Sequence, residues 1–209
     1  MTLTLVERAE SYARAFPKFP APRADARWLD AVWMMGNNYR SLAPGFYGSY
    51  PPGYLRRVGA LFPDARRVLH IFSGSLTSEQ ARDGLHEDAR VLRIDAREEP
   101  HPGVRPDVVA DVCSGLLPFI GKSFGGADLI LADPPYSVED ALHYGPPMVD
   151  RKKALARCAE ALAPGGHVVW MDQVLPMYRK DALTHVGNIC IIRSANHRVR
   201  LVSIFRRAA

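Results

Sequence analysis

A series of short apolar runs in the second part of the chain limits the available folds more than any other feature of the sequence. The runs cover residues 68–72, 91–94, 108–112, 129–132 and 167–171. Each run is too short for a helix and rich in β-branched residues, which is typical of strands buried on both faces. Because crossover segments separate the runs, the pattern predicts a parallel, doubly wound sheet.

The segments after the fourth run complete this α/β pattern. A helix is expected over residues 150–162, because Asp150 can cap its first turn and Pro164 follows its end. Residues 189–193 and 199–205 flank a short polar turn and predict an antiparallel hairpin. The expected fold is therefore Rossmann-like, with a mostly parallel seven-stranded sheet that ends in this hairpin.

The first 65 residues lack this alternation and are expected to form a helical lead-in that packs on or over the sheet. Thr4 and Glu7 have the spacing of a capping box, which predicts a first helix. A second helix is expected to begin near Pro22 and to stop near Gly36, and a third to begin at Pro51. Residues 1–209 are thus expected to form one domain, with residues 66–209 as its core and no separate target-recognition domain.

Composition excludes several classes of protein. The chain has 209 residues, of which 47% are hydrophobic and 23% charged, so wholesale disorder is excluded. It contains no long apolar run and no basic start of a secretory signal, so we expect a cytoplasmic protein without a membrane partner. The three widely spaced cysteines and the histidines lack ligand spacing, and no metal site is expected. A net charge of +5 permits a nucleic-acid partner.

The sequence Asp133-Pro134-Pro135-Tyr136 follows the fourth run and is the most specific motif in the chain. One interpretation is a plain Pro-Pro turn that ends a strand. The other is chemical: the Asp133 carboxylate and the Pro134 carbonyl can both accept hydrogen bonds from an exocyclic base amine. Such bonds draw the nitrogen toward tetrahedral geometry and free its lone pair for attack. The Tyr136 ring offers a flat face on which a base can stack.

This motif resembles the [DNS]-P-P-[YFW] signature of the amino-methyltransferases of nucleic acids, within the class I S-adenosylmethionine-dependent methyltransferases. The similarity covers roughly residues 47–209. Phe72, Ser73 and Gly74 resemble the glycine turn with which the family holds the methionine part of the cofactor, although Leu76 replaces the second glycine. The resemblance implies S-adenosyl-L-methionine as the cofactor and Asp133, Pro134, Pro135 and Tyr136 as the catalytic residues.

The resemblance also assigns cofactor contacts at the ends of the second and third runs. Asp95 would accept hydrogen bonds from the ribose hydroxyls, and a solvated aspartate is the alternative. Asp111 would accept from the adenine amine, with the main chain of Val112 or Cys113 at the ring edge, and the alternative is an ordinary N-cap.

Two further groups of residues have both a functional and a structural interpretation. Tyr50 and Pro51 precede a helix whose free N–H groups would receive the cofactor carboxylate, or they simply begin a packing helix. Residues that would contact nucleic acid, or else form a hairpin turn and a solvated helix face, are Asn196, His197, Arg198 and Lys152.

The resulting hypothesis is a methyltransferase that forms N6-methyladenine in DNA with low sequence specificity. The target base would be flipped out of the duplex to reach the site. RNA bases of rRNA or tRNA are the alternative substrate, and cytosine N4 or guanine N2 the alternative amines. A third possibility is a catalytically weak protein with this fold that only binds nucleic acid. The sequence does not indicate an oligomeric state.

Overall fold

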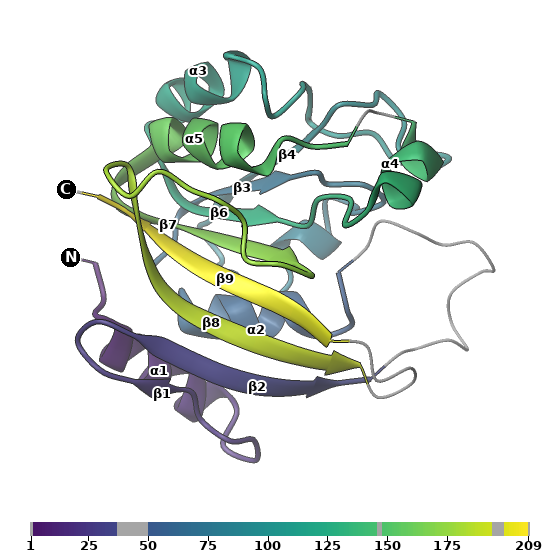
Figure 1. Cartoon of the computed structure of the whole chain (residues 1–209). Helices are drawn as coiled ribbons and strands as arrows, with labels where there is room; N and C mark the ends of the chain where they lie inside the picture. The colour runs from purple at the N-terminus through teal and green to yellow at the C-terminus, as the bar shows by residue number, and fades with distance from the viewer. Residues whose placement is uncertain (1, 37–49, 146–147, 194–198, 209) are drawn as a thin grey trace.

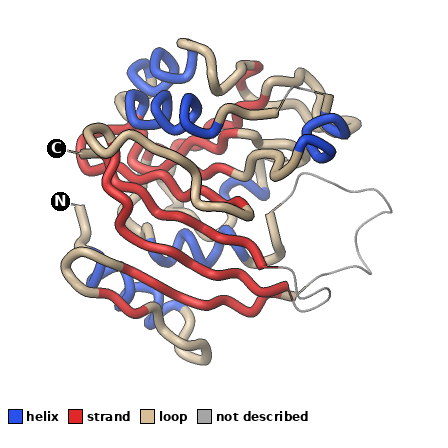
Figure 2. The backbone as a smooth tube through the Cα atoms, viewed as in Figure 1, coloured by secondary structure: helices blue, strands red, loops and turns tan. Residues whose placement is uncertain are grey.

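The computed structural model describes residues 2–36, 50–145, 148–193 and 199–208, which contain one nine-stranded sheet with helices on both faces (Figures 1 and 2). From edge to edge the strands are β5 (Val108–Val109), β4 (Arg90–Asp95), β3 (Arg67–Ile71), β6 (Ala127–Ala132), β7 (Leu162–Asp172), β9 (Val199–Arg207), β8 (Leu183–Arg193), β2 (Leu29–Met35) and β1 (Arg23–Ala24). The β9 strand runs antiparallel to both β7 and β8, and β1 runs antiparallel to β2. The other neighbours are parallel.

Two hydrophobic cores lie on opposite faces of the sheet. On one face, α1 (Leu5–Ala15) and α2 (Tyr54–Leu61) pack against alternate residues of the central strands. On the other face, α3 (Leu116–Ser123) and α5 (Arg151–Ala161) do the same. None of the helices among the described residues is long and apolar enough to cross a membrane.

The predicted Rossmann-like fold class is confirmed. The seven strands from β5 to β8 form the expected mostly parallel sheet, and the antiparallel β8–β9 pair is the expected terminal hairpin. Helix α5 begins after Asp150, whose side chain accepts a hydrogen bond from the Lys153 backbone N–H, as the capping argument predicts. Strands β2 and β1 raise the total to nine.

The expected second helix near residues 22–36 is wrong, because this segment forms β1 and β2. Leu29, Trp33 and Met35 are buried on the α1 side and alternate with exposed residues, so the burial period is that of a strand. Strand β2 pairs in parallel with β8 along its whole length. Gly187 permits this pairing, since a Cβ there would lie 2.3 Å from the Leu29 carbonyl oxygen.

Two smaller differences concern loops at the carboxyl ends of the strands. The third apolar run forms only the two-residue strand β5, because Asp111 closes a turn by accepting a hydrogen bond from the Cys113 backbone N–H (2.8 Å). The sequence predicts a loop over residues 137–147, whereas the structure has the helix α4 (Val138–Tyr144) within this segment. Ser137 caps this helix by accepting from the Asp140 backbone N–H (3.1 Å).

An ion pair fastens the first helix to the rest of the domain. The Arg8 guanidinium is 2% exposed and donates to the Asp64 carboxylate (2.7 Å) and to the Leu61 carbonyl (3.0 Å). The Thr4–Glu7 capping box expected at the start of the helix is present. A buried cation that loses its counter-ion costs far more than an exposed one, so docking of α1 depends on this pair.

Replacing Asp64 should therefore weaken folding. We expect Asp64→Asn to lower the free energy of unfolding by roughly 3 kcal/mol, because the buried Arg8 charge loses its partner. The matched control is Asp83→Asn, which removes the exposed Arg56–Asp83 pair and should cost less than about 1 kcal/mol. Urea denaturation measures both values, and equal losses would contradict the proposed role of Arg8–Asp64.

Candidate active site

The Asp133-Pro134-Pro135-Tyr136 motif lies at the carboxyl edge of the sheet, directly after the central strand β6. Leu129 to Ala132 in β6 are fully buried, so Asp133 is the first position at which this strand leaves the apolar interior. In open parallel sheets this edge is where ligands bind. Pro134 is buried, whereas Asp133 and Tyr136 are partly exposed.

The side chains of Asp133 and Tyr136 contact each other. The Tyr136 hydroxyl donates a hydrogen bond to Asp133 Oδ1. Burial raises the pKa of Asp133 to about 6, while Arg200 and the Tyr136 hydroxyl partly oppose this shift. The carboxyl group is therefore mainly ionised at pH 7 and available as a hydrogen-bond acceptor.

Arg200 in β9, a residue that the motifs in the sequence did not indicate, completes this arrangement. Its guanidinium carbon lies 4.9 Å from the centroid of the Tyr136 ring, a cation–π distance. One face of the ring is thus covered by Arg200, so the expected base stacking would use the opposite face. A charged residue within the otherwise apolar start of β9 is the signal that was available in the sequence.

A buried ion pair holds the backbone of the motif. Arg151 donates to both oxygens of Asp172 (2.7 and 3.1 Å) and also to the Tyr136 carbonyl oxygen (2.9 Å). Asp172 is fully buried and also accepts from the Trp170 indole N–H (3.2 Å). Arg151, the first residue of α5, therefore holds the backbone of the motif in position. The neighbouring Lys152, predicted to contact nucleic acid, is exposed.

The glycine turn and Asp95 come together as the sequence predicts. Asp95 Oδ2 accepts from the Gly74 backbone N–H (2.9 Å), and the Ser73 backbone N–H donates to the Ile94 carbonyl (3.1 Å). Gly74 has a φ of +51° and Phe72 one of +56°, so the chain reverses direction sharply after β3. This turn brings main-chain groups and a carboxylate to the carboxyl edge of β3 and β4.

Leu76, the departure from the family pattern, does not point into this turn. Its side chain is 3% exposed and belongs to the core on the α2 face. Its carbonyl oxygen accepts a hydrogen bond from Arg93 (2.9 Å). The missing second glycine is thus accommodated by burial of the leucine side chain.

The predicted cofactor residues after β5 differ in their exposure and contacts. Asp111 is exposed and Val112 is buried, while the Cys113 thiol is directed to the Asp150 carbonyl (3.6 Å). Asp111 closes a turn but is not a helix N-cap, because Gly115 holds that position at the start of α3, so the alternative interpretation of an ordinary N-cap is wrong. Asn196, His197 and Arg198 lie outside the described residues.

Tyr50 and Pro51 lie next to the first turn of α2. The rings of Tyr50 and Tyr54 stack with centroids 5.1 Å apart, and the Pro51 carbonyl accepts from the Tyr54 backbone N–H (2.9 Å). Both hydroxyl groups are buried without a hydrogen-bond partner among the described residues. The Asp133 carboxylate helps raise the pKa of both, although burial is the main cause. The two hydroxyls therefore lie within the electrostatic reach of Asp133.

His70 is fully buried in β3. Its Nε2 lies 3.0 Å from the Ala81 carbonyl oxygen. Burial lowers the pKa of His70 to about 4, so the ring is neutral at pH 7. Groups of three or more acidic, histidine or cysteine side chains that could hold a metal ion are absent from the described part of the chain.

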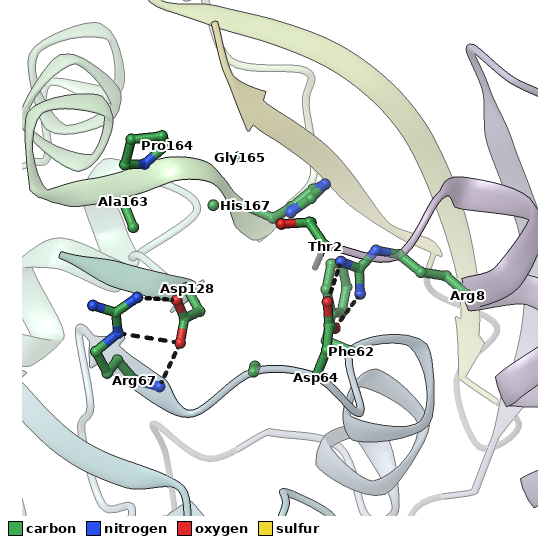
Figure 3. A pocket seen from close by; sticks show the side chains of 12 residues that line it. Thr2, Arg8, Phe62, Asp64, Arg67, Asp128, Ala163, Pro164, Gly165 and His167 are labelled. Carbon is green, nitrogen blue, oxygen red and sulfur yellow. Dashed lines mark hydrogen bonds and ion pairs between the residues drawn. The ribbon is translucent and has the colours of Figure 1, made fainter. Parts of the chain in front are cut away.

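A separate cavity of about 270 Å³ opens at the opposite, amino edge of the sheet (Figure 3). The ion pairs Arg8–Asp64 and Arg67–Asp128 line it, and His167 lies beside it. Its charged groups are already paired with one another, and none of the predicted site residues line it. The candidate active site is therefore the carboxyl edge around Asp133.

No protein-family model matches the sequence, and no curated protein matches it. Several solved structures do. A putative S-adenosylmethionine-dependent methyltransferase from Streptococcus mutans has a TM-score of 0.50 at 16% identity, over 77% of this chain and 50% of that chain. TrmN from Thermus thermophilus has a TM-score of 0.47 at 16% identity, over 100% and 81%. The N-methyltransferase NodS from Bradyrhizobium japonicum WM9 has a TM-score of 0.46 at 16% identity, over 74% and 93%. The chain thus has the Rossmann-like fold of the class I methyltransferases.

The burial of Leu76 leads to a prediction about stability. We expect Leu76→Gly, which restores the glycine of the family pattern, to lower the free energy of unfolding by roughly 3–5 kcal/mol, because it removes a buried leucine and adds backbone freedom. Thr77→Gly is the control at the next, partly exposed position and should cost about 1 kcal/mol. Denaturant titration distinguishes the two, and a stable Leu76→Gly protein would contradict the structural role of the leucine.

Proposed function

We propose that the chain is an S-adenosylmethionine-dependent methyltransferase that acts on an exocyclic amine of a nucleic-acid base. The leading target is adenine N6 in DNA, with low sequence specificity. The observation that carries this proposal is the position of Asp133, Pro134 and Tyr136 at the end of the central strand of a methyltransferase fold. The raised pKa of Asp133 and its hydrogen bond with the Tyr136 hydroxyl support this role for the motif over a plain turn.

The chemistry follows from the properties of the amine. Its lone pair is delocalised into the heterocycle, so it is a weak nucleophile until its geometry changes. The ionised Asp133 carboxylate and the Pro134 carbonyl would each accept a hydrogen bond from one N–H group of the amine. These bonds would draw the amine nitrogen toward tetrahedral geometry. Because Arg151 holds the Tyr136 carbonyl, the acceptors are positioned before substrate arrives, which lowers the cost of orienting the amine.

The residues at the ends of β3 and β4 fit the cofactor. Asp95 lies at the end of β4, where a carboxylate can accept ribose hydroxyl protons, and its bond to Gly74 keeps it oriented. Phe72 and Ser73 would line the methionine part, and the free N–H groups at the start of α2 would face the carboxylate. Bound S-adenosylmethionine would supply an electrophilic methyl group for direct transfer to the amine, with its S–C bond broken as the N–C bond forms; S-adenosylhomocysteine would be the leaving group, and the methylated amine would lose one proton to solvent.

A labelled-methyl transfer assay tests the proposal. The protein is incubated with methyl-tritiated S-adenosylmethionine and, separately, with DNA, rRNA and tRNA, and the modified nucleoside is identified by mass spectrometry. We expect N6-methyladenine in DNA, and label in RNA alone would replace DNA by RNA as the substrate. Asp133→Ala should lose at least about 100-fold in rate while calorimetry shows unchanged cofactor binding. Cofactor binding without transfer to any nucleic acid would overturn the proposal.

The activity should depend on pH through Asp133. Because the carboxylate must be ionised to accept from the amine, kcat/KM should rise with pH through about 6 and level off above it. In Asp133→Asn the amide oxygen still accepts but does not titrate, so we expect a lower rate without this rise. Initial rates between pH 5 and 8 measure the profile, and a wild-type-like midpoint in Asp133→Asn would assign the titration to another group.

Tyr136→Phe provides a second check on the same titration. The Tyr136 hydroxyl lowers the pKa of Asp133, so its removal should move the midpoint of the profile to higher pH and leave the plateau rate close to wild type. Tyr136→Ala also removes the stacking face and should lower kcat/KM by roughly 10- to 100-fold.

A further inference from the structure

Arg200 is a cation at the candidate active site without an ion-pair partner among the residues that the structure describes. The guanidinium groups of Arg8, Arg93 and Arg151 each bond an aspartate, whereas that of Arg200 lies over the Tyr136 ring. The side chain is partly buried. A partly desolvated guanidinium whose N–H groups are not used by a carboxylate is a ready donor for a ligand.

The side chain of Arg200 projects from the same face of the sheet as that of Asp133. Leu129 and Leu131, which alternate with Ile130 in β6, belong to the core on the α2 face, and Asp133 continues their series. Val202 and Ile204 in β9 belong to the same core, and Arg200 precedes them in the alternation. The two charged groups therefore face one common space at the carboxyl edge.

Tyr136 connects these two groups. Its hydroxyl bonds the Asp133 carboxylate, and its ring lies under the Arg200 guanidinium at 4.9 Å. Tyr136 thus contacts both the acceptor Asp133 and the donor Arg200. The Tyr54 hydroxyl, buried and without a partner, lies within the electrostatic reach of both.

The amine-bearing bases offer a matching pair of groups. In adenine, cytosine and guanine, the carbon that carries the exocyclic amine also carries a ring nitrogen with a free lone pair: N1, N3 and N3, respectively. The amine is a donor and the adjacent ring nitrogen an acceptor. A carboxylate and a guanidinium that face the same space have the complementary pattern.

We propose that Arg200 determines specificity by donating a hydrogen bond to the ring nitrogen next to the target amine, while Asp133 accepts from the amine itself. This inference rests on the proposed function, because it presupposes that a base amine is methylated. Asp133 and Arg200 together select a heterocycle edge that carries an amine donor next to a ring-nitrogen acceptor. A base whose neighbouring ring nitrogen carries a hydrogen or a methyl group places it against the Arg200 donor and is rejected.

A cycle that changes both the enzyme and the base tests this pairing. Wild-type protein and Arg200→Met are assayed on DNA oligonucleotides that contain a single adenine or a single 1-deazaadenine, in which the ring nitrogen is replaced by C–H. We expect each single change to lower kcat/KM by roughly 10- to 100-fold, because a hydrogen bond to a charged donor is lost. In Arg200→Met the two oligonucleotides should react within about twofold of each other. If the first assay identifies RNA, cytosine or guanine, the corresponding RNA or 3-deaza base is used.

Controls separate the pairing from a structural role. Arg200→Met should bind S-adenosylmethionine with wild-type affinity, and Arg200→Lys should recover part of the rate on adenine because it keeps a charged donor. Arg206→Met, at the exposed far end of the same strand, should retain the full response to the deaza base.

The outcomes distinguish this inference from the function on which it rests. If wild-type protein methylates an amine but the effects of Arg200→Met and of the deaza base simply multiply, the pairing is wrong and the proposed function stands. If wild-type protein methylates no nucleic-acid base, both are overturned. If the deaza base reacts as fast as adenine with wild type, the ring nitrogen is not read and the inference fails.

Discussion

Burial of the central strands on both faces is the constraint on which the rest of the structure depends. Residues of β3, β6 and β7 contact the α1–α2 core on one side and the α3–α5 core on the other. An unpaired polar side chain within these strands would cost several kcal/mol, roughly 2–7 on transfer scales. The carboxylates Asp95, Asp133 and Asp172 lie at or directly after strand ends, whereas the histidines buried within the strands, His70 and His167, have pKa values lowered by burial and are neutral at pH 7.

The three strand-end carboxylates take different tasks because their partners differ. Asp172 is fully buried and paired with Arg151, which makes it part of the scaffold that holds the Tyr136 carbonyl. Asp95 bonds main-chain N–H groups and shapes the glycine turn. Among the described residues, Asp133 has the Tyr136 hydroxyl as its side-chain hydrogen-bond partner, and its pKa is raised, so this carboxylate is available for the target amine.

The local pattern of the sequence was sufficient to predict the central strands and the residues at their ends. Apolar runs flanked by breakers predicted the strands around β6, and strand ends predicted where Asp95 and Asp133 would lie. The β2 strand was not predictable in the same way, since Leu29, Val32 and Trp33 fit helical spacing while Leu29, Trp33 and Met35 fit alternation, and pairing with β8 decided between the two patterns. Tertiary contact likewise gives Arg200 its place over Tyr136, and a sequence pattern contains no measure of such proximity.

The two outermost strands of the sheet have a consequence for the behaviour of the chain in concentrated solution. Both β1 and β5 contain only two residues, so each outermost strand itself offers few unpaired N–H and C=O groups, while it covers only two residues of its neighbour, β2 or β4. The long strand β8 is instead covered by β2, whose residues Leu29–Met35 pair with residues 187–193 of β8. Short edge strands resist edge-to-edge association with another sheet. The segment that departs from the expected helix thus protects the hairpin against aggregation, and deletion of the lead-in would expose a long, apolar edge.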